Sequence, residues 1–232
     1  MSKIILFNSP RNVGKSRAIT YLNSKGYNLI SAECKESLHN LTMTLFGVDP
    51  DRYWEIYNTR ELKEVPLPEF SAILPYSEIC SMQELVGRWV TKDIFGSHRK
   101  VEFTIREAMI YVSEIVVKSR WGNDWFGKER VRSMVKLENN YSDANGCFVN
   151  KDLTFTDDSA AFVEELAPLI EYIGQENILL LRVHRDGFTF EGDSRSYIPD
   201  GVIDNTIDVY NNGTEQGYFD QVEEIVRKFL NE

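Results

Sequence analysis

The chain has 232 residues, 42% of them hydrophobic, which is enough for one sizeable α/β core. Its formal net charge of −10 argues against a general affinity for DNA or RNA, because Lys and Arg drive such binding by displacing counterions. Three scattered cysteines show no metal-ligand spacing, and no apolar run approaches the roughly 20 residues that span a membrane. With no signal-peptide pattern at the N-terminus, we expect a cytoplasmic protein with no membrane partner.

A glycine-bearing loop stands between an apolar run at residues 4–7 and a helical pattern over 15–25. Its sequence is Ser9-Pro-Arg-Asn-Val-Gly-Lys-Ser16. Strand, loop, Lys-Ser and helix, in this order, form the context of a phosphate-binding loop. Backbone N–H groups and the positive end of the helix would surround a polyphosphate. The residues expected to contact ATP here are Arg11, Asn12, Val13, Gly14, Lys15 and Ser16.

Two side chains of this loop carry specific roles. Lys15 would reach the β- and γ-phosphates of ATP, and the Ser16 hydroxyl would hold Mg²⁺. Ser9 stands where the usual motif has its first glycine, which a tight turn favours. The alternative is an ordinary strand-to-helix turn in which Gly14 is only a turn residue and Lys15 is solvated. The flanking strand and helix patterns favour phosphate binding.

Strands and helices alternate along most of the chain. Helices are predicted over residues 15–25, after 36 up to 47, and over 52–58, 81–90, 105–120, 127–137, 158–173 and 216–230. Strands are predicted at residues 4–7, 28–31, 147–150, 178–183 and 206–210. This alternation indicates an α/β fold, with a mainly parallel five-stranded sheet between two helical layers.

Residues 59–104 are the least regular part, and we interpret them as loops with one helix, inserted on the main core. Ligands of open α/β sheets bind at the carboxyl ends of the strands. Glu33, Asp152 and Arg185 each follow a predicted strand, as the glycine-bearing loop does. We therefore expect these side chains to converge on the loop.

The role of Arg106 and the role of the basic stretch 127–137 each have two interpretations. Arg106 lies in the first turn of a predicted helix, which is unfavourable for a cation, so an anionic partner is expected. That partner is either a nearby carboxylate, from Glu102 or Glu107, or a substrate phosphate. The basic stretch 127–137 is either a solvated helix face or a lid that closes on a transferring phosphoryl group.

The order of these motifs resembles the phage-type deoxynucleoside monophosphate kinases, a branch of the P-loop nucleoside monophosphate kinases. Ser-Ala-Glu-Cys-Lys-Glu at 31–36 is similar to the family's Phe-Ala-Asp-Pro-Leu-Lys-Glu, and Arg-Glu-Ala-Met at 106–109 to its Arg-Glu-Leu-Leu. Residues 117–125 resemble its Val-Arg…Gly-x-Asp-x-Trp run. Residues 152–158 align with Asp-Val-Arg-Phe-Pro-Asn-Glu, with Thr154 in place of the arginine, and 211–214 with Asn-Asp-Gly-Thr.

The resemblance implies an enzyme of nucleotide biosynthesis that transfers the γ-phosphate of ATP to a deoxynucleoside 5′-monophosphate, in the host cytoplasm if phage-encoded. ATP and Mg²⁺ would be its cofactors, and its partners small molecules rather than nucleic acid polymers. It implies a single kinase domain with a core at about 1–34, 105–120 and 146–232, a monophosphate-binding insert at 35–104 and a lid at 121–145.

The resemblance also implies roles for individual residues. Lys15, Arg120, Arg130 and Asp152 would be catalytic, with Ser16 and Asp152 at the metal, and Arg182 or Arg185 would flank the adenine, with Arg185 preferred. The acceptor would be bound by Glu33, Lys35, Arg106 and Trp125.

Two alternatives remain open at this point. One is another small-molecule kinase on the same scaffold, acting on dephospho-coenzyme A or a nucleoside. The other is a nucleotide-binding regulatory protein without catalysis, which the departures at Ser9 and Thr154 would suit. The sequence leaves open the preferred base, the choice between deoxyribose and ribose, and the oligomeric state, for which a homodimer is one option.

Overall fold

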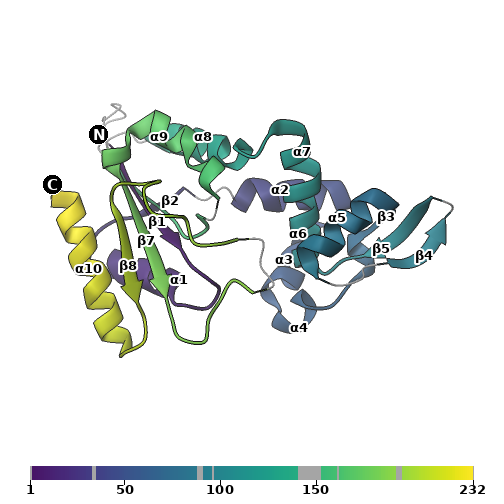
Figure 1. Ribbon diagram of the computed structural model, residues 1–232, viewed down its shortest axis with the longest axis horizontal. Coiled ribbons are helices and arrows are strands. Elements are labelled where there is room, and N and C mark those ends of the chain that lie inside the picture. The colour runs from purple at the N-terminus through teal and green to yellow at the C-terminus, as the bar shows by residue number, and fades with distance from the viewer. Residues whose placement is uncertain are drawn as a thin grey trace. The chain divides into compact units, whose positions relative to one another are not determined.

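A computed structural model describes residues 2–32, 35–87, 91–95, 97–140, 153–160, 162–191 and 195–231, with the backbone alone for 91–95. The chain forms two compact units (Figure 1). The first unit consists of Met1–Cys34, Asp124–Glu191 and Arg195–Glu232, and the second mainly of Lys35–Asn123. The predicted helix at 105–120 therefore belongs to the second unit rather than to the core that we expected.

The first unit is built on a parallel sheet, which has five strands in the described residues and the order β2-β6-β1-β7-β8. Each neighbouring pair runs parallel, and Ile5 of the central strand lies opposite both Thr156 and Leu179. The expected α/β fold with a parallel sheet is thus confirmed. The strands are β1 (Lys3–Asn8), β2 (Ile30–Ser31), β6 (Thr154–Asp157), β7 (Ile178–His184) and β8 (Thr206–Tyr210).

The strand between β2 and β1 differs from the prediction. The predicted segment 147–150 lies outside the described residues, and the strand that pairs with β1 is Thr154–Asp157. Its β-branched and aromatic residues suit a strand. The backbone N–H of Lys3 donates to the Leu153 carbonyl over 2.9 Å, which fixes the start of this pairing. The carboxylates at the carboxyl end of the strand are therefore Asp157 and Asp158.

Side chains of β1 alternate between two cores, as the two-residue period of a strand requires. Ile4 and Leu6 pack with residues of α8 (Trp125–Asn140) and α9 (Ala167–Ile173). Ile5 and Phe7 pack with residues of α1 (Lys15–Ser24) and α10 (Glu215–Asn231). Figure 1 shows these helix pairs on opposite faces of the sheet, so the first unit has three layers.

Two helices of the first unit differ from their predictions. The helix predicted over 158–173 begins only at Ala167, after the 3₁₀ turn Val163–Glu165 (η3). Pro168 explains the late start, because proline is favoured in the first turn of a helix and disfavoured in its interior.

Helix α8 lies where we expected a lid, but it is part of the core. Its buried residues include Gly127 and Met134, and Met134 packs in the same core as Ile4. A Cβ added at Gly127 would lie 2.2 Å from the carbonyl oxygen of Glu165, so only glycine allows this close approach. Residues 125–140 of the lid expected at 121–145 thus form a helix that packs on the core of the first unit.

The second unit contains a three-stranded antiparallel sheet, β3-β5-β4, that the sequence analysis missed. Its strands are short and one reads His-Arg-Lys-Val-Glu, so no clean apolar alternation marks them. The strands are β3 (Ser71–Pro75), β4 (Thr91–Phe95) and β5 (His98–Glu102). The helix predicted at 81–90 is α5 (Tyr76–Val86), which ends at Gly87 in the left-handed conformation.

The helices at 35–46 and 50–58 agree with the sequence pattern, whereas the short helical segments at 60–63 and 68–70 lie within residues 59–104, where only one helix was expected. The helix predicted over 105–120 is one continuous helix that widens to the π form in its middle. These elements are α2 (Lys35–Phe46), α3 (Pro50–Asn58), α4 (Arg60–Lys63), the 3₁₀ turn η1 (Pro68–Phe70), α6 (Ile105–Ile110), the π segment η2 (Tyr111–Val117) and α7 (Lys118–Trp121).

Candidate phosphate-binding site

The glycine-bearing loop connects β1 to α1 at the carboxyl edge of the parallel sheet. Two of its residues have positive φ, Asn12 at 60° and Gly14 at 102°. Ser9 has no positive φ, so the backbone there does not require the glycine of the usual motif. The departure at Ser9 is thus compatible with the loop conformation.

Gly14 precedes the first residue of α1 and supplies no side chain to the N–H groups of the first turn. That turn also holds no acidic residue. The positive end of the helix is therefore not neutralised by its own residues, which favours an anion at this position.

Close packing is a second reason for glycine at position 14. A Cβ there would lie 2.9 Å from Nδ2 of Asn211 and 3.4 Å from the ring of Tyr218. These neighbours come from the segment after β8 and from α10. The loop is therefore held against the far end of the chain.

Two loop carbonyls accept hydrogen bonds from outside the loop. Asn211 Nδ2 donates to the Val13 oxygen over 2.8 Å, and Arg185 Nη1 donates to the Asn12 oxygen over 3.4 Å. The backbone N–H of Asn211 in turn donates to the His184 oxygen over 2.8 Å. Because these two carbonyls already accept hydrogen bonds, the loop has its backbone N–H groups left to donate to an anion.

Lys15 and Ser16 begin α1. The ammonium group of Lys15 donates to the carbonyl oxygen of Ser9 over 3.3 Å, so its side chain reaches back over the loop. The Ser16 hydroxyl donates to Oδ2 of Asp158 over 3.0 Å. The loop, a cation and a carboxylate therefore meet at one point of the sheet edge.

Asp157 and Asp158 follow β6, the strand directly beside β1. Asp157 is fully buried, and its Oδ1 accepts from the backbone N–H of Ser159 over 2.6 Å and from the Ser159 hydroxyl. Asp158 is the one whose carboxylate reaches the loop. Sequence reasoning missed both residues, although the run Thr-Phe-Thr before two aspartates was the signal that could have identified them.

Arg130 corrects the expectation of a mobile lid arginine. Its side chain is 0% exposed, and its Nε lies 2.6 Å from Oδ2 of Asp157. Its Nη1 donates to the Glu165 backbone oxygen over 3.3 Å, and its Nη2 lies 3.9 Å from the Glu165 carboxylate. A guanidinium fixed in the core between two acids cannot swing onto a transferring phosphoryl group.

Two other cations of α8 form ion pairs at its surface. Lys128 pairs with Asp124 over 2.7 Å, and Arg132 pairs with Glu129. These pairs match the interpretation of a solvated helix face.

The remaining predicted residues fall into three groups. Lys35 begins α2, Arg106 lies in the first turn of α6, and Arg120 is exposed on α7, so all three belong to the second unit. Trp125 begins α8 in the first unit, where its ring packs edge-on against Phe126. Glu33 and Asp152 lie outside the described residues.

A charged cluster joins the neighbouring strands β7 and β8. Arg182 holds both carboxylate oxygens of Asp208, at 3.0 and 2.6 Å, and His184 Nε2 lies 2.5 Å from Oδ1. Burial alone would raise the pKa of Asp208, but hydrogen bonds from Arg182 and His184 outweigh it and hold this pKa below its usual value. Arg182 is thus committed to Asp208, and Arg185 is the arginine that contacts the loop.

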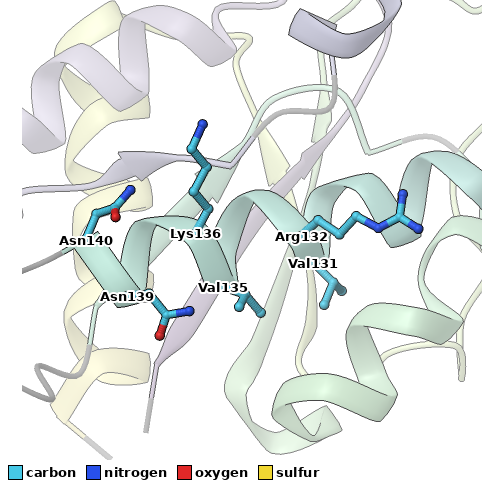
Figure 2. A pocket seen from close by; sticks show the side chains of 6 residues that line it. All are labelled: Val131, Arg132, Val135, Lys136, Asn139 and Asn140. Carbon is cyan, nitrogen blue, oxygen red and sulfur yellow. The ribbon is translucent and has the colours of Figure 1, made fainter.

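A shallow hollow of about 430 Å³ runs along α8 (Figure 2). Val131 and Val135 point to one side of the helix there, and Lys136 points to the other. The glycine-bearing loop contributes no lining residue to this hollow. Among the described residues, no three or more His, Cys, Asp or Glu side chains gather as a possible metal site.

No family model matches the chain, and a search of curated proteins finds no match either. Among the helices that the structure describes, none is both long enough and apolar enough to cross a membrane.

Proposed function

We propose that the protein is a kinase that transfers the γ-phosphate of ATP to a deoxynucleoside 5′-monophosphate. The observation that carries this proposal is the pairing of Ser16, at the end of the glycine-bearing loop, with Asp158 over 3.0 Å. Because β6 lies directly beside β1, a hydroxyl and a carboxylate meet where the phosphates of ATP would lie.

The residues present fit a magnesium ion. Mg²⁺ in nucleotide sites is usually held by one or two protein oxygens together with phosphate oxygens and water. The Ser16 hydroxyl and the Asp158 carboxylate supply such oxygens from two neighbouring elements. Mg²⁺, when bound, would neutralise charge on the β- and γ-phosphates. In this role Asp158 takes the place that the sequence analysis gave to Asp152.

The protein's own groups would act by position and charge. Backbone N–H groups of residues 11–16 would surround the β-phosphate, and Lys15 would turn from the Ser9 carbonyl to the γ-phosphate. The acceptor phosphate needs no general base, because its oxygen is already ionised. Cations for the acceptor and for the transferring group remain assigned, by the resemblance, to Lys35, Arg106 and Arg120.

The test is ADP release by the purified protein with ATP and Mg²⁺, using each deoxynucleoside and nucleoside monophosphate in turn. Nucleosides and dephospho-coenzyme A complete the panel of acceptors. Lys15→Ala should lower acceptor-dependent turnover by orders of magnitude. The matched control is Lys228→Ala, a surface lysine on α10 that pairs with Glu224. Equal turnover in Lys15→Ala and wild type would overturn the proposal.

The burial of Arg130 favours a second candidate, a protein that binds ATP without transferring phosphate. The lid arginine that we expected to stabilise the transferring group is committed to the core. ATP binding that Lys15→Ala abolishes, with no turnover on any acceptor of the panel, would support this candidate over the kinase.

A further inference from the structure

We infer that Arg130 is a positioning residue, which sets the affinity of the site for the metal–ATP complex by fixing the turn that carries Asp158. The inference rests on the proposed nucleotide site. It assigns a function to a buried arginine that phosphate transfer itself does not use.

Asp157 and Asp158 divide two tasks between them. Both oxygens of Asp157 are engaged inside the protein, Oδ2 by Arg130 and Oδ1 by the backbone and hydroxyl of Ser159. The neighbouring carboxylate, on Asp158, reaches Ser16 instead. Asp157 therefore anchors the turn, and Asp158 is the carboxylate that faces the glycine-bearing loop.

Residue 158 lies inside a small hydrogen-bonded ring. The carboxylate of Asp157 accepts the N–H of Ser159, two residues ahead, in the manner of an Asx turn. Asp158 thus lies between the residue that carries this carboxylate and the N–H group that donates to it. Arg130 holds that same carboxylate from its other oxygen, over 2.6 Å. A shift of the guanidinium would move the ring and Asp158 together.

Arg130 is itself fixed by the packing of α8. Gly127 allows the helix to approach the Glu165 carbonyl closely, and Arg130 donates to that same carbonyl over 3.3 Å. Its guanidinium thus joins α8, the turn before α9 and the end of β6. A planar group with several donors in a fixed geometry suits this task, whereas a lysine has one flexible point charge.

A purely structural role explains this arrangement less well. A buried ion pair often adds little stability compared with apolar residues of similar volume, because both charges lose their hydration. The pair here lies one residue from the carboxylate that faces the phosphate-binding loop. Positioning of that carboxylate accounts for the location of the pair.

The experiment measures the dissociation constant of ATP, by calorimetry, with and without Mg²⁺. The ratio of the two constants is the gain in ATP affinity that the metal provides. Asp158→Asn is the reference variant, because it shows how much of this gain is lost when the carboxylate is removed. The test variants are Arg130→Lys, Arg130→Met and the double variant Arg130→Met/Asp157→Leu, which replaces the buried pair by apolar groups. Arg132→Met is the control, two positions further along α8 with a side chain that is 69% exposed.

We expect the folded Arg130 variants to lose about tenfold or more of the magnesium-dependent gain, because residues that orient metal ligands have effects of this size. Their ATP affinity without Mg²⁺ should match that of wild type. The double variant should regain much of the thermal stability that Arg130→Met loses, but not the magnesium-dependent gain. Arg132→Met should behave as wild type.

Ser159→Ala is the substitute test variant if the Arg130 variants do not fold. It removes the hydrogen bond from the Ser159 hydroxyl to Asp157, and Ser159 is only partly buried. It should lower the magnesium-dependent gain severalfold. The inference is overturned if a folded Arg130 variant keeps the full magnesium-dependent gain while Asp158→Asn loses it. If no Arg130 variant folds, an unchanged gain in Ser159→Ala overturns the inference in the same way. Failure of wild type to bind ATP, with or without Mg²⁺, instead overturns the proposed function and this inference with it.

Discussion

The side-chain amide of Asn211 donates a hydrogen bond to the backbone oxygen of Val13 over 2.8 Å, across 198 positions of sequence. The segment after the edge strand β8 thereby holds the loop that follows the central strand β1. The same nitrogen would lie 2.9 Å from a Cβ at Gly14, so the contact and the glycine depend on each other. The conformation of the glycine-bearing loop is therefore determined in part by the segment after the last strand of the sheet.

Asn211→Ala should weaken ATP binding without unfolding the protein. Loss of one hydrogen bond to a backbone oxygen costs about 1 kcal/mol, which corresponds to roughly fivefold in affinity if it acts on the bound loop. Calorimetric titration with ATP measures it. Asn139→Ala, an exposed asparagine on α8, is the control. ATP affinity equal to wild type in Asn211→Ala would show that the loop holds its conformation without this contact.

Gly14→Ala should lose ATP binding. The added methyl group would combine a positive φ of 102° with the approach of Asn211, and such a backbone strain costs on the order of 1–3 kcal/mol. Gly187→Ala is the matched control, because Gly187 has a φ of 77° in the same unit and no atom within 4 Å of its added Cβ. Both variants should lower the midpoint of urea unfolding. Only Gly14→Ala should lose ATP binding, and equal ATP affinity in the two variants would contradict the prediction.

Ser9→Gly restores the usual motif but should not improve the site. Ser9 has ordinary backbone angles and a buried side chain, so glycine there adds freedom to the unfolded chain and removes packing. We expect a loss of roughly 0.5–1 kcal/mol in the free energy of unfolding. ATP affinity should stay at the wild-type value. Tighter ATP binding by Ser9→Gly would show that the serine obstructs the phosphate.

The stability of the second unit should fall as the pH drops below about 6.5. Burial, followed by the charges of Lys35 and Lys63, lowers the pKa of His39 to about 4, and its Nδ1 lies 2.7 Å from the Tyr53 hydroxyl. Because this pKa is lower in the folded than in the unfolded state, the unfolded chain binds more protons between pH 6.5 and 4. The stabilisation is fully present above pH 6.5 and is lost as the pH falls towards 4.

Urea unfolding followed by circular dichroism at pH 7, 6 and 5 measures this effect. The shift corresponds to about 3 kcal/mol at most. His39→Gln keeps a hydrogen-bonding side chain without a group that titrates here. Its stability should change less with pH than that of wild type, and parallel curves for the two proteins would contradict the prediction.

The strand, glycine-bearing loop and helix at the N-terminus could be predicted from the sequence because their signal is contiguous. An apolar strand, Gly14, Lys15-Ser16 and a helical pattern follow one another within a short stretch. The four strands at 3–8, 30–31, 178–184 and 206–210 were also predicted near their observed positions. The first and third are apolar runs, and the other two are short β-prone segments beside turn residues. Local patterns of this kind determine the layers and the parallel sheet.

Arg130 and Asp158 could not be assigned in the same way. A cation-rich stretch looks solvated, and nothing near Arg130 in sequence indicates that Asp157 and Glu165 enclose it. The carboxylate of Asp158 could be placed only once the bounds of β6 were known. The strand beside β1 was expected at 147–150 and is Thr154–Asp157, so the sequence analysis chose Asp152, rather than Asp158, as the carboxylate after a strand.

The π segment Tyr111–Val117 alters the angular phase of the helix in which it lies. In an uninterrupted α-helix, positions 106 and 120 would differ by about 40° around the axis. A π segment accommodates about one extra residue, which increases that difference to about 140°. A relative with one residue fewer in this segment would therefore keep both flanking α-helical parts, yet present its two arginines on nearly the same side.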